Sequence, residues 1–136
     1  MYRTLIACAL TLAASGAFAD SLNPSLNPDL MTAGHGSGTS STIIFTNPGP
    51  GFASNIVTTF VYASGTTAGG QRLFKEVDTC NGATVAAGGT CKVIISFMDA
   101  CPAHNSALQY TLTTTTASGS VTRIPVWGTS TGGVCY

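Results

Sequence analysis

The stretch that decides the fold runs from Asp78 to Phe97 and reads DTCNGATVAAGGTCKVIISF. Two cysteines, Cys80 and Cys91, bracket a segment with the pairs Asn81-Gly82 and Gly88-Gly89, both typical of tight turns. The residues that follow alternate, with Cys91, Val93, Ile95 and Phe97 on one side and Lys92, Ile94 and Ser96 on the other. This pattern predicts a turn-rich loop that leads directly into a strand with one buried face.

Similar short alternating runs recur along the chain at intervals of roughly eight to twelve residues. No window of a dozen residues carries the stripe of an amphipathic helix. The runs cover 42–46, 56–62, 71–77, 91–97, 108–112 and 124–126. Pro125 predicts that the last of them is an edge strand or contains a bulge, because proline cannot donate to a ladder. The spacing predicts an all-β sandwich or barrel.

The first nineteen residues have the organisation of a signal peptide. Arg3 precedes an apolar run over 5–14, and Ala17-Phe18-Ala19 forms a cleavage signal before Asp20. A lipoprotein motif ending at Cys8 would lie too near Met1, and the apolar run is shorter than the roughly 18 residues that a membrane span needs. We therefore expect domain boundaries at 1–19 for a signal peptide, 20–41 for an extended arm and 42–136 for the sandwich. The mature chain would be secreted or at the cell surface, with a periplasmic location also open, and would have no membrane span.

Charged residues are scarce. Asp, Glu, Lys and Arg make up 7% of the chain, compared with about 25% in typical proteins. Removal of Arg3 leaves four basic and five acidic residues, without a basic run that could follow nucleic-acid phosphates. Two interpretations remain open: neutral polar groups keep the protein soluble, or its surface packs against copies of itself.

Four cysteines remain after Cys8 leaves with the signal peptide. An even number in an exported chain predicts two disulfides, with three possible pairings, of which we favour Cys80–Cys91 and Cys101–Cys135. A zinc site is the alternative, but no Cys-x-x-Cys spacing supports it.

The segment 20–41 contains the repeat Ser-Leu-Asn-Pro at 21–24 and 25–28. Leu22, Leu26 and Leu30 recur every four residues, as on a helical stripe, but the two prolines disfavour a helix. We expect an extended arm, with an edge strand near Leu30.

Three motifs resemble the immunoglobulin-like domains of the bacterial choice-of-anchor-D and ASPM/SPD-2/Hydin family. They are Thr46-Asn47-Pro48-Gly49, the loop 80–91 with the strand 93–97, and Ile124-Pro125-Val126-Trp127-Gly128-Thr129. The resemblance extends over roughly 30–129. It implies an immunoglobulin-like seven-stranded β-sandwich with a structural, adhesive or partner-binding role and no catalysis. The segment 98–104 with Cys101 and the tail 132–136 with Cys135 depart from the family pattern.

The ionisable residues do not form a recognisable catalytic pattern. His35 and His104 lack a second metal ligand at a suitable spacing, and the acids Glu76, Asp78 and Asp99 are scattered. Lys75 and Glu76 are expected to be solvated charges on an edge. There is no phosphate-binding glycine loop. We expect no enzyme activity, no cofactor and no metal.

Trp127 has the opposite parity to Val126 and would point outward, either as a recognition anchor or covered by the Leu-rich arm. The contact candidates are Trp127, Leu22, Leu26 and Leu30. The first functional hypothesis is a self-associating subunit of a surface assembly, possibly a filament, whose arm pairs with an edge of a neighbour. The second is a monomeric binding domain for a glycan or a protein.

Overall fold

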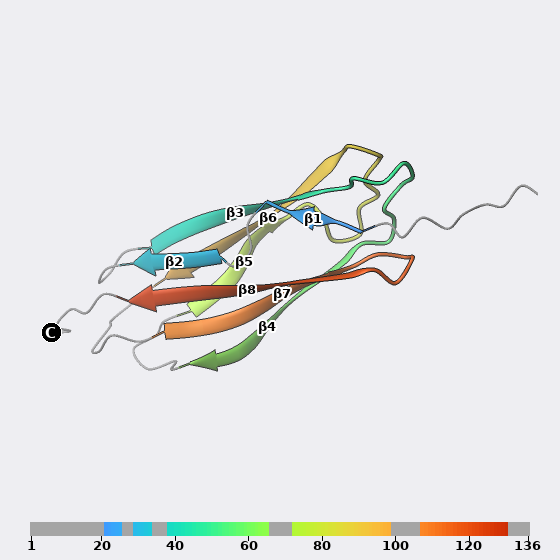
Figure 1. The fold of residues 1–136 in the computed structure, drawn as a ribbon. Helices are drawn as coiled ribbons and strands as arrows, with labels where there is room; N and C mark the ends of the chain where they lie inside the picture. The colour runs from blue at the N-terminus through green and yellow to red at the C-terminus, as the bar shows by residue number, and fades with distance from the viewer. Residues whose placement is uncertain (1–20, 26–28, 34–37, 66–71, 99–106, 131–136) are drawn as a thin grey trace, which may run out of the picture.

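Two four-stranded sheets pack face to face in the computed structural model, which describes residues 21–25, 29–33, 38–65, 72–98 and 107–130 (Figure 1). The strands are β1 (Asn23–Pro24), β2 (Asp29–Ala33), β3 (Gly38–Thr46), β4 (Val57–Gly65), β5 (Arg72–Asp78), β6 (Thr90–Met98), β7 (Ala107–Thr115) and β8 (Val121–Ser130).

The first sheet has the strand order β1-β3-β6-β5 and the second has the order β2-β8-β7-β4. Neighbouring strands are antiparallel, except that β2 runs parallel to β8. The short strands β1 and β2 occupy corresponding edges of the two sheets, so together they take the place of one first strand. The predicted immunoglobulin-like seven-stranded sandwich is confirmed.

The core lies between the sheets and is built from the alternating positions that the sequence indicates. Along β6, Cys91, Val93, Ile95 and Phe97 are buried, while Lys92 is exposed. Strands β3, β7 and β8 contribute two large side chains each, all with no exposed surface: Ile43 and Phe45, Leu108 and Leu112, and Ile124 and Val126. Burial of this apolar surface is the main force that holds the two sheets together.

The described part of the N-terminal arm belongs to the sandwich. Leu22 and Met31 are buried in the core, with exposed fractions of 2% and 3%. The expected edge strand near Leu30 is β2. Strand β3 begins at Gly38 rather than at residue 42, because residues 38–41 pair with Ile95–Met98 of β6 although they lack an apolar alternation.

The prediction that Pro125 marks an edge or a bulge is wrong. Strand β8 lies between β7 and β2, and its register with β7 is continuous from Ala107↔Thr129 to Thr115↔Val121. Its register with the described part of β2 begins at Asp29↔Val126, one residue after the proline. Pro125 therefore precedes this ladder, in which a missing amide hydrogen would be costly.

Gly128 is an inward position of β8 at which the two sheets approach closely. A Cβ atom at this position would lie 2.4 Å from an aromatic carbon of Phe97, on β6 of the opposite sheet. The Phe97 ring is itself fully buried and cannot move into solvent. The glycine in the Trp127-Gly128-Thr129 motif is therefore explained by the space that this ring occupies.

We expect Gly128→Ala to lower the free energy of unfolding by about 1–3 kcal/mol, because the core must shift to admit the methyl group. Gly38→Ala is the matched control: it also lies in a strand, but its new Cβ would meet only ordinary contacts at 3.4 and 3.7 Å. Urea unfolding of both variants measures the difference. Equal stability of the two variants would contradict the proposed close approach.

Candidate functional site

The loops 47–56, 79–89 and 116–120 gather at one end of the sandwich (Figure 1). Ala53 and Val85 exchange two backbone hydrogen bonds of 2.9 and 2.8 Å, which join the first loop to the second. The Ala117 amide donates to the Ser54 carbonyl at 2.9 Å and joins the third loop to the first. We call these three loops the braced end.

Asn47 is the central residue of the braced end and has no exposed surface. Its side-chain amide donates to the carbonyls of Gly51 at 2.8 Å and Val85 at 2.9 Å, and its Oδ1 accepts from the Gly49 amide at 3.0 Å. Its backbone bonds to the Gly88 and Gly89 peptide groups as well. This residue therefore satisfies polar groups of two loops that are far apart in the sequence. The Thr46–Gly49 motif has a structural role.

Replacement of Asn47 by Ala should lower the free energy of unfolding by about 2–4 kcal/mol, because it removes the side-chain donor to the Gly51 carbonyl, one of the two donors to the Val85 carbonyl and the acceptor of the Gly49 amide. Asn47→Asp should be at least as harmful, since it directs a carboxylate at the same carbonyls. The control is Asn81→Ala, which removes one hydrogen bond of an exposed residue, from the Thr58 amide at 3.2 Å. Its cost should be about 1 kcal/mol or less. Thermal unfolding measures the three variants, and a harmless Asn47→Ala would show that the loops do not depend on this side chain.

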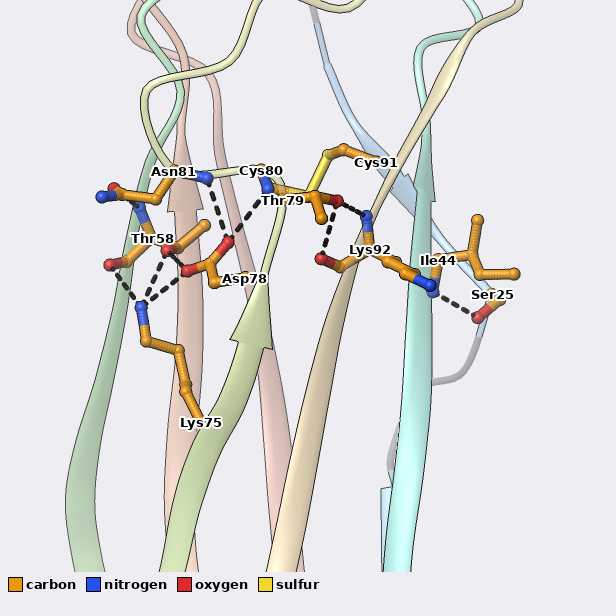
Figure 2. The surroundings of a disulfide bond; sticks show 10 residues. All are labelled: Ser25, Ile44, Thr58, Lys75, Asp78, Thr79, Cys80, Asn81, Cys91 and Lys92. Carbon is orange, nitrogen blue, oxygen red and sulfur yellow. Dashed lines mark hydrogen bonds and ion pairs between the residues drawn. A yellow bond between two sulfur atoms is a disulfide. The ribbon is translucent and has the colours of Figure 1, made fainter.

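A disulfide between Cys80 and Cys91 closes the second loop of the braced end (Figure 2). This part of the predicted pairing is confirmed. In the chain-entropy model, closing a loop of this length stabilises the folded chain by about 3 kcal/mol. Cys101 and Cys135 lie outside the described residues, so their pairing stays a prediction.

Lys75, Asp78 and Thr58 form a polar clamp that joins the two sheets at their β4 and β5 edges (Figure 2). The Lys75 ammonium donates to an Asp78 carboxylate oxygen at 2.7 Å and to the Thr58 hydroxyl at 3.0 Å. The Thr58 hydroxyl also donates to the Asp78 carboxylate. The prediction of a purely solvated Lys75 is wrong, because its side chain is only 27% exposed and bridges to β4.

The Asp78 carboxylate is also held by its own loop. Its Oδ1 accepts from the backbone amides of Cys80 and Asn81, both at 3.0 Å. Burial raises the pKa of Asp78, but the hydrogen bonds from Lys75, Thr58 and these two amides outweigh it, and the net pKa is lowered. The clamp therefore favours the ionised carboxylate.

We expect stability to fall on the acid side because of this residue. A pKa that is lower in the folded than in the unfolded chain stabilises the fold above about pH 4, and this contribution is lost as pH falls through the folded pKa. Asp78→Asn should cost about 1–3 kcal/mol at neutral pH and should flatten the decline between about pH 6 and about pH 2.

Urea unfolding at several pH values measures the effect of Asp78→Asn. Thr58→Val is the control, because it removes one donor but keeps the carboxylate, and it should retain most of the acid-side decline. An unchanged pH profile in Asp78→Asn would contradict the assignment.

The predicted contact residues that the structure describes lie on or beside β8. Trp127 is half-buried on β8, where its Cα partners are Gln109 of β7 and Leu30 of β2. Leu22 is buried, and its carbonyl accepts from the Thr122 hydroxyl at 2.9 Å, near the start of β8. Leu26, His35, Asp99 and His104 lie outside the described residues.

The described residues hold no group of three or more His, Cys, Asp or Glu side chains that could bind a metal ion. Within the same part of the chain, no helix is long and apolar enough to cross a membrane. The sequence interpretation missed Phe52, which is 66% exposed on the first loop of the braced end. It also missed the clamp, which depends on the proximity of β4 and β5.

No family model matches this chain, and no curated protein matches it in sequence. Among solved structures, an ASH/PapD-like domain of human CEP192 is similar over 96% of this chain and 99% of that domain, with a TM-score of 0.55 and 12% identity. This likeness supports the fold of an ASH-type immunoglobulin-like domain.

Two bacterial enzymes contain similar regions. They are the secreted serine protease VesC from Vibrio cholerae, with a TM-score of 0.59 and 13% identity, and a family 123 glycoside hydrolase from Clostridium perfringens, with a TM-score of 0.57 and 9% identity. The likeness covers 82% and 80% of this chain but spans only 23% and 24% of those enzymes. It concerns the fold alone.

Proposed function

We propose that this protein is an exported, non-enzymatic structural module of the choice-of-anchor-D type that associates with copies of itself by exchanging its N-terminal strands. The observation that carries the proposal is the position of the arm, since β1 and β2 are both edge strands. The other six strands form the body of both sheets. Exchange of an edge element between identical copies costs little, because the same contacts form again in the partner.

The contacts of the arm are few and well suited to such an exchange. Two side chains, Leu22 and Met31, enter the core. The Ser25 amide donates to the Ile44 carbonyl at 2.8 Å, and the Ser25 hydroxyl accepts from the Ile44 amide at 3.0 Å. The short β1 has only two pairs with β3, and β2 has five with β8. A neighbour could provide all of these contacts in place of the chain's own body.

The composition supports the same proposal. With 7% charged residues and a formal net charge of zero for the whole chain, little electrostatic repulsion keeps copies apart. The disulfide Cys80–Cys91 agrees with export to an oxidising compartment. The product would be a subunit of a secreted or cell-surface assembly, such as a filament, that binds no nucleic acid.

A cysteine pair tests strand exchange directly. Thr32 of β2 and Thr129 of β8 are Cα partners. The mature chain with Thr32→Cys and Thr129→Cys should form covalent dimers and larger species on a non-reducing gel if the arms are exchanged. It should give only a cross-linked monomer if each arm stays in its own sandwich.

The single variants Thr32→Cys and Thr129→Cys are the controls for pairing with the native cysteines. Light scattering on the unmodified mature chain gives the mass without any added thiol. A monomer in both measurements would overturn self-association and leave a monomeric binding domain.

A further inference from the structure

A hollow of about 290 Å³ lies on the outer face of the first sheet, at the end away from the braced end. Residues of two cross-strand rows line it: Ser40, Ser96 and Phe74 in one row, and Gly38 and Met98 in the next, which Arg72 continues on β5. The small residues Gly38, Ser40 and Ser96 leave space beside the larger side chains of Phe74 and Met98. The lining of the hollow therefore combines apolar side chains, Phe74 and Met98, with the polar side chains of Ser40, Ser96 and Glu76.

A β-bulge brings a carboxylate to this hollow. The register between β5 and β6 passes from Lys75↔Ile95 to Val77↔Ile94, so Glu76 is an extra residue without its own partner. The Ser96 hydroxyl donates to a carboxylate oxygen of Glu76. Ser96 is only 8% exposed although it lies on the outer face, which shows that its neighbours cover it. The carboxylate is therefore held in position at the hollow while Glu76 remains exposed.

A positive charge lies beside two of the residues that line the hollow, Phe74 and Met98. The Arg72 guanidinium lies 5.7 Å from the centre of the Phe74 ring and 3.9 Å from the Met98 sulfur. The hollow and its rim together thus carry one negative group, Glu76, and one positive group, Arg72. A lone cation or anion would gain little here, because the second charge opposes it.

The chemistry of the hollow matches one class of ligand best. A saccharide ring has a face of C–H groups that packs on aromatic and apolar side chains, and hydroxyls that donate to carboxylates. Phe74 and Met98 supply the apolar walls, Glu76 supplies a charged acceptor, and the Ser40 hydroxyl supplies a further polar contact. The volume is at the lower end of ligand sites, which suits one or two sugar rings.

We propose that this hollow binds a neutral saccharide, with Phe74 as the packing surface and Glu76 as the hydroxyl acceptor. This inference goes beyond self-association through the arm. It uses the outer face of β3, β5 and β6, whereas the arm pairs with β8 and with the far end of β3. The two proposals therefore fail or succeed independently.

The test is a titration of the isotope-labelled mature chain with methyl glycosides of glucose, galactose, mannose and N-acetylglucosamine, followed by amide chemical shifts. We expect at least one glycoside to bind at millimolar concentration and to shift the amides of 38–40, 72–77 and 96–98. Phe74→Ala should weaken binding about tenfold. Glu76→Gln, which changes an exposed residue and should not affect folding, should weaken it roughly fivefold.

Phe52→Ala is the matched control, because it removes a more exposed ring from the opposite end of the sandwich and should leave the affinity unchanged. Nα-acetyl-lysinamide is the counter-probe for a cationic side chain. The proposal is overturned if no glycoside shifts these amides, if the shifts occur elsewhere, if Phe52→Ala weakens binding as much as Phe74→Ala, or if the lysine derivative binds in place of the sugars.

Discussion

The buried side chain of Asn47 is the interaction on which the braced end depends. Its amide and carbonyl groups hold the 47–51 turn and the disulfide loop to each other. Loops at the end of a sandwich usually contact water and tolerate change. Here a neutral, fully buried amide satisfies the backbone groups instead. The chain can therefore present Phe52 and two exposed prolines, Pro48 and Pro50, on a well-defined frame without using charge.

The few charges of the described chain are concentrated on one edge strand. Four of the seven residues of β5 are Arg72, Lys75, Glu76 and Asp78. Charged residues on an edge discourage pairing with another sheet. Lys75 extends this protection to β4, which has no charge of its own, because its ammonium approaches the Thr58 carbonyl at 3.3 Å while Asn81 covers the Thr58 amide. The same strand thus carries the charges of its own edge, contacts the start of β4 at Thr58 and provides the carboxylate of the proposed saccharide site.

The sequence predicts best those elements that are determined by residues close to each other in the chain. The alternation from Cys91 to Phe97, the turns at Gly82 and Gly88 and the burial of Ile43 and Phe45 follow from residue order alone, and both turn glycines have a positive φ. The start of β3 does not follow from residue order, because residues 38–41 lack an apolar alternation and belong to the strand through their pairing with β6. The clamp and the bulge at Glu76 also depend on contacts between strands. Lys75 and Glu76 are adjacent, and their sequence alone does not show that Lys75 bonds to Thr58 on β4 while Glu76 bonds to Ser96 on β6. In the arm, Leu22 and Met31 enter the core, but the leucine spacing alone does not identify Met31.

The outer faces of the two sheets differ in a way that bears on association. On β4, β7 and β8, Arg123 is the one charged residue, and Val57, Val61 and Val121 are exposed among threonines. The outer face of the first sheet carries Lys92, Arg72 and Glu76 instead. Strand β2 joins the nearly neutral sheet, so two copies that exchange β2 would bring together surfaces with little charge to repel each other. The first sheet, with its hollow and its charges of both signs, would then remain the face that is free to meet a different kind of ligand.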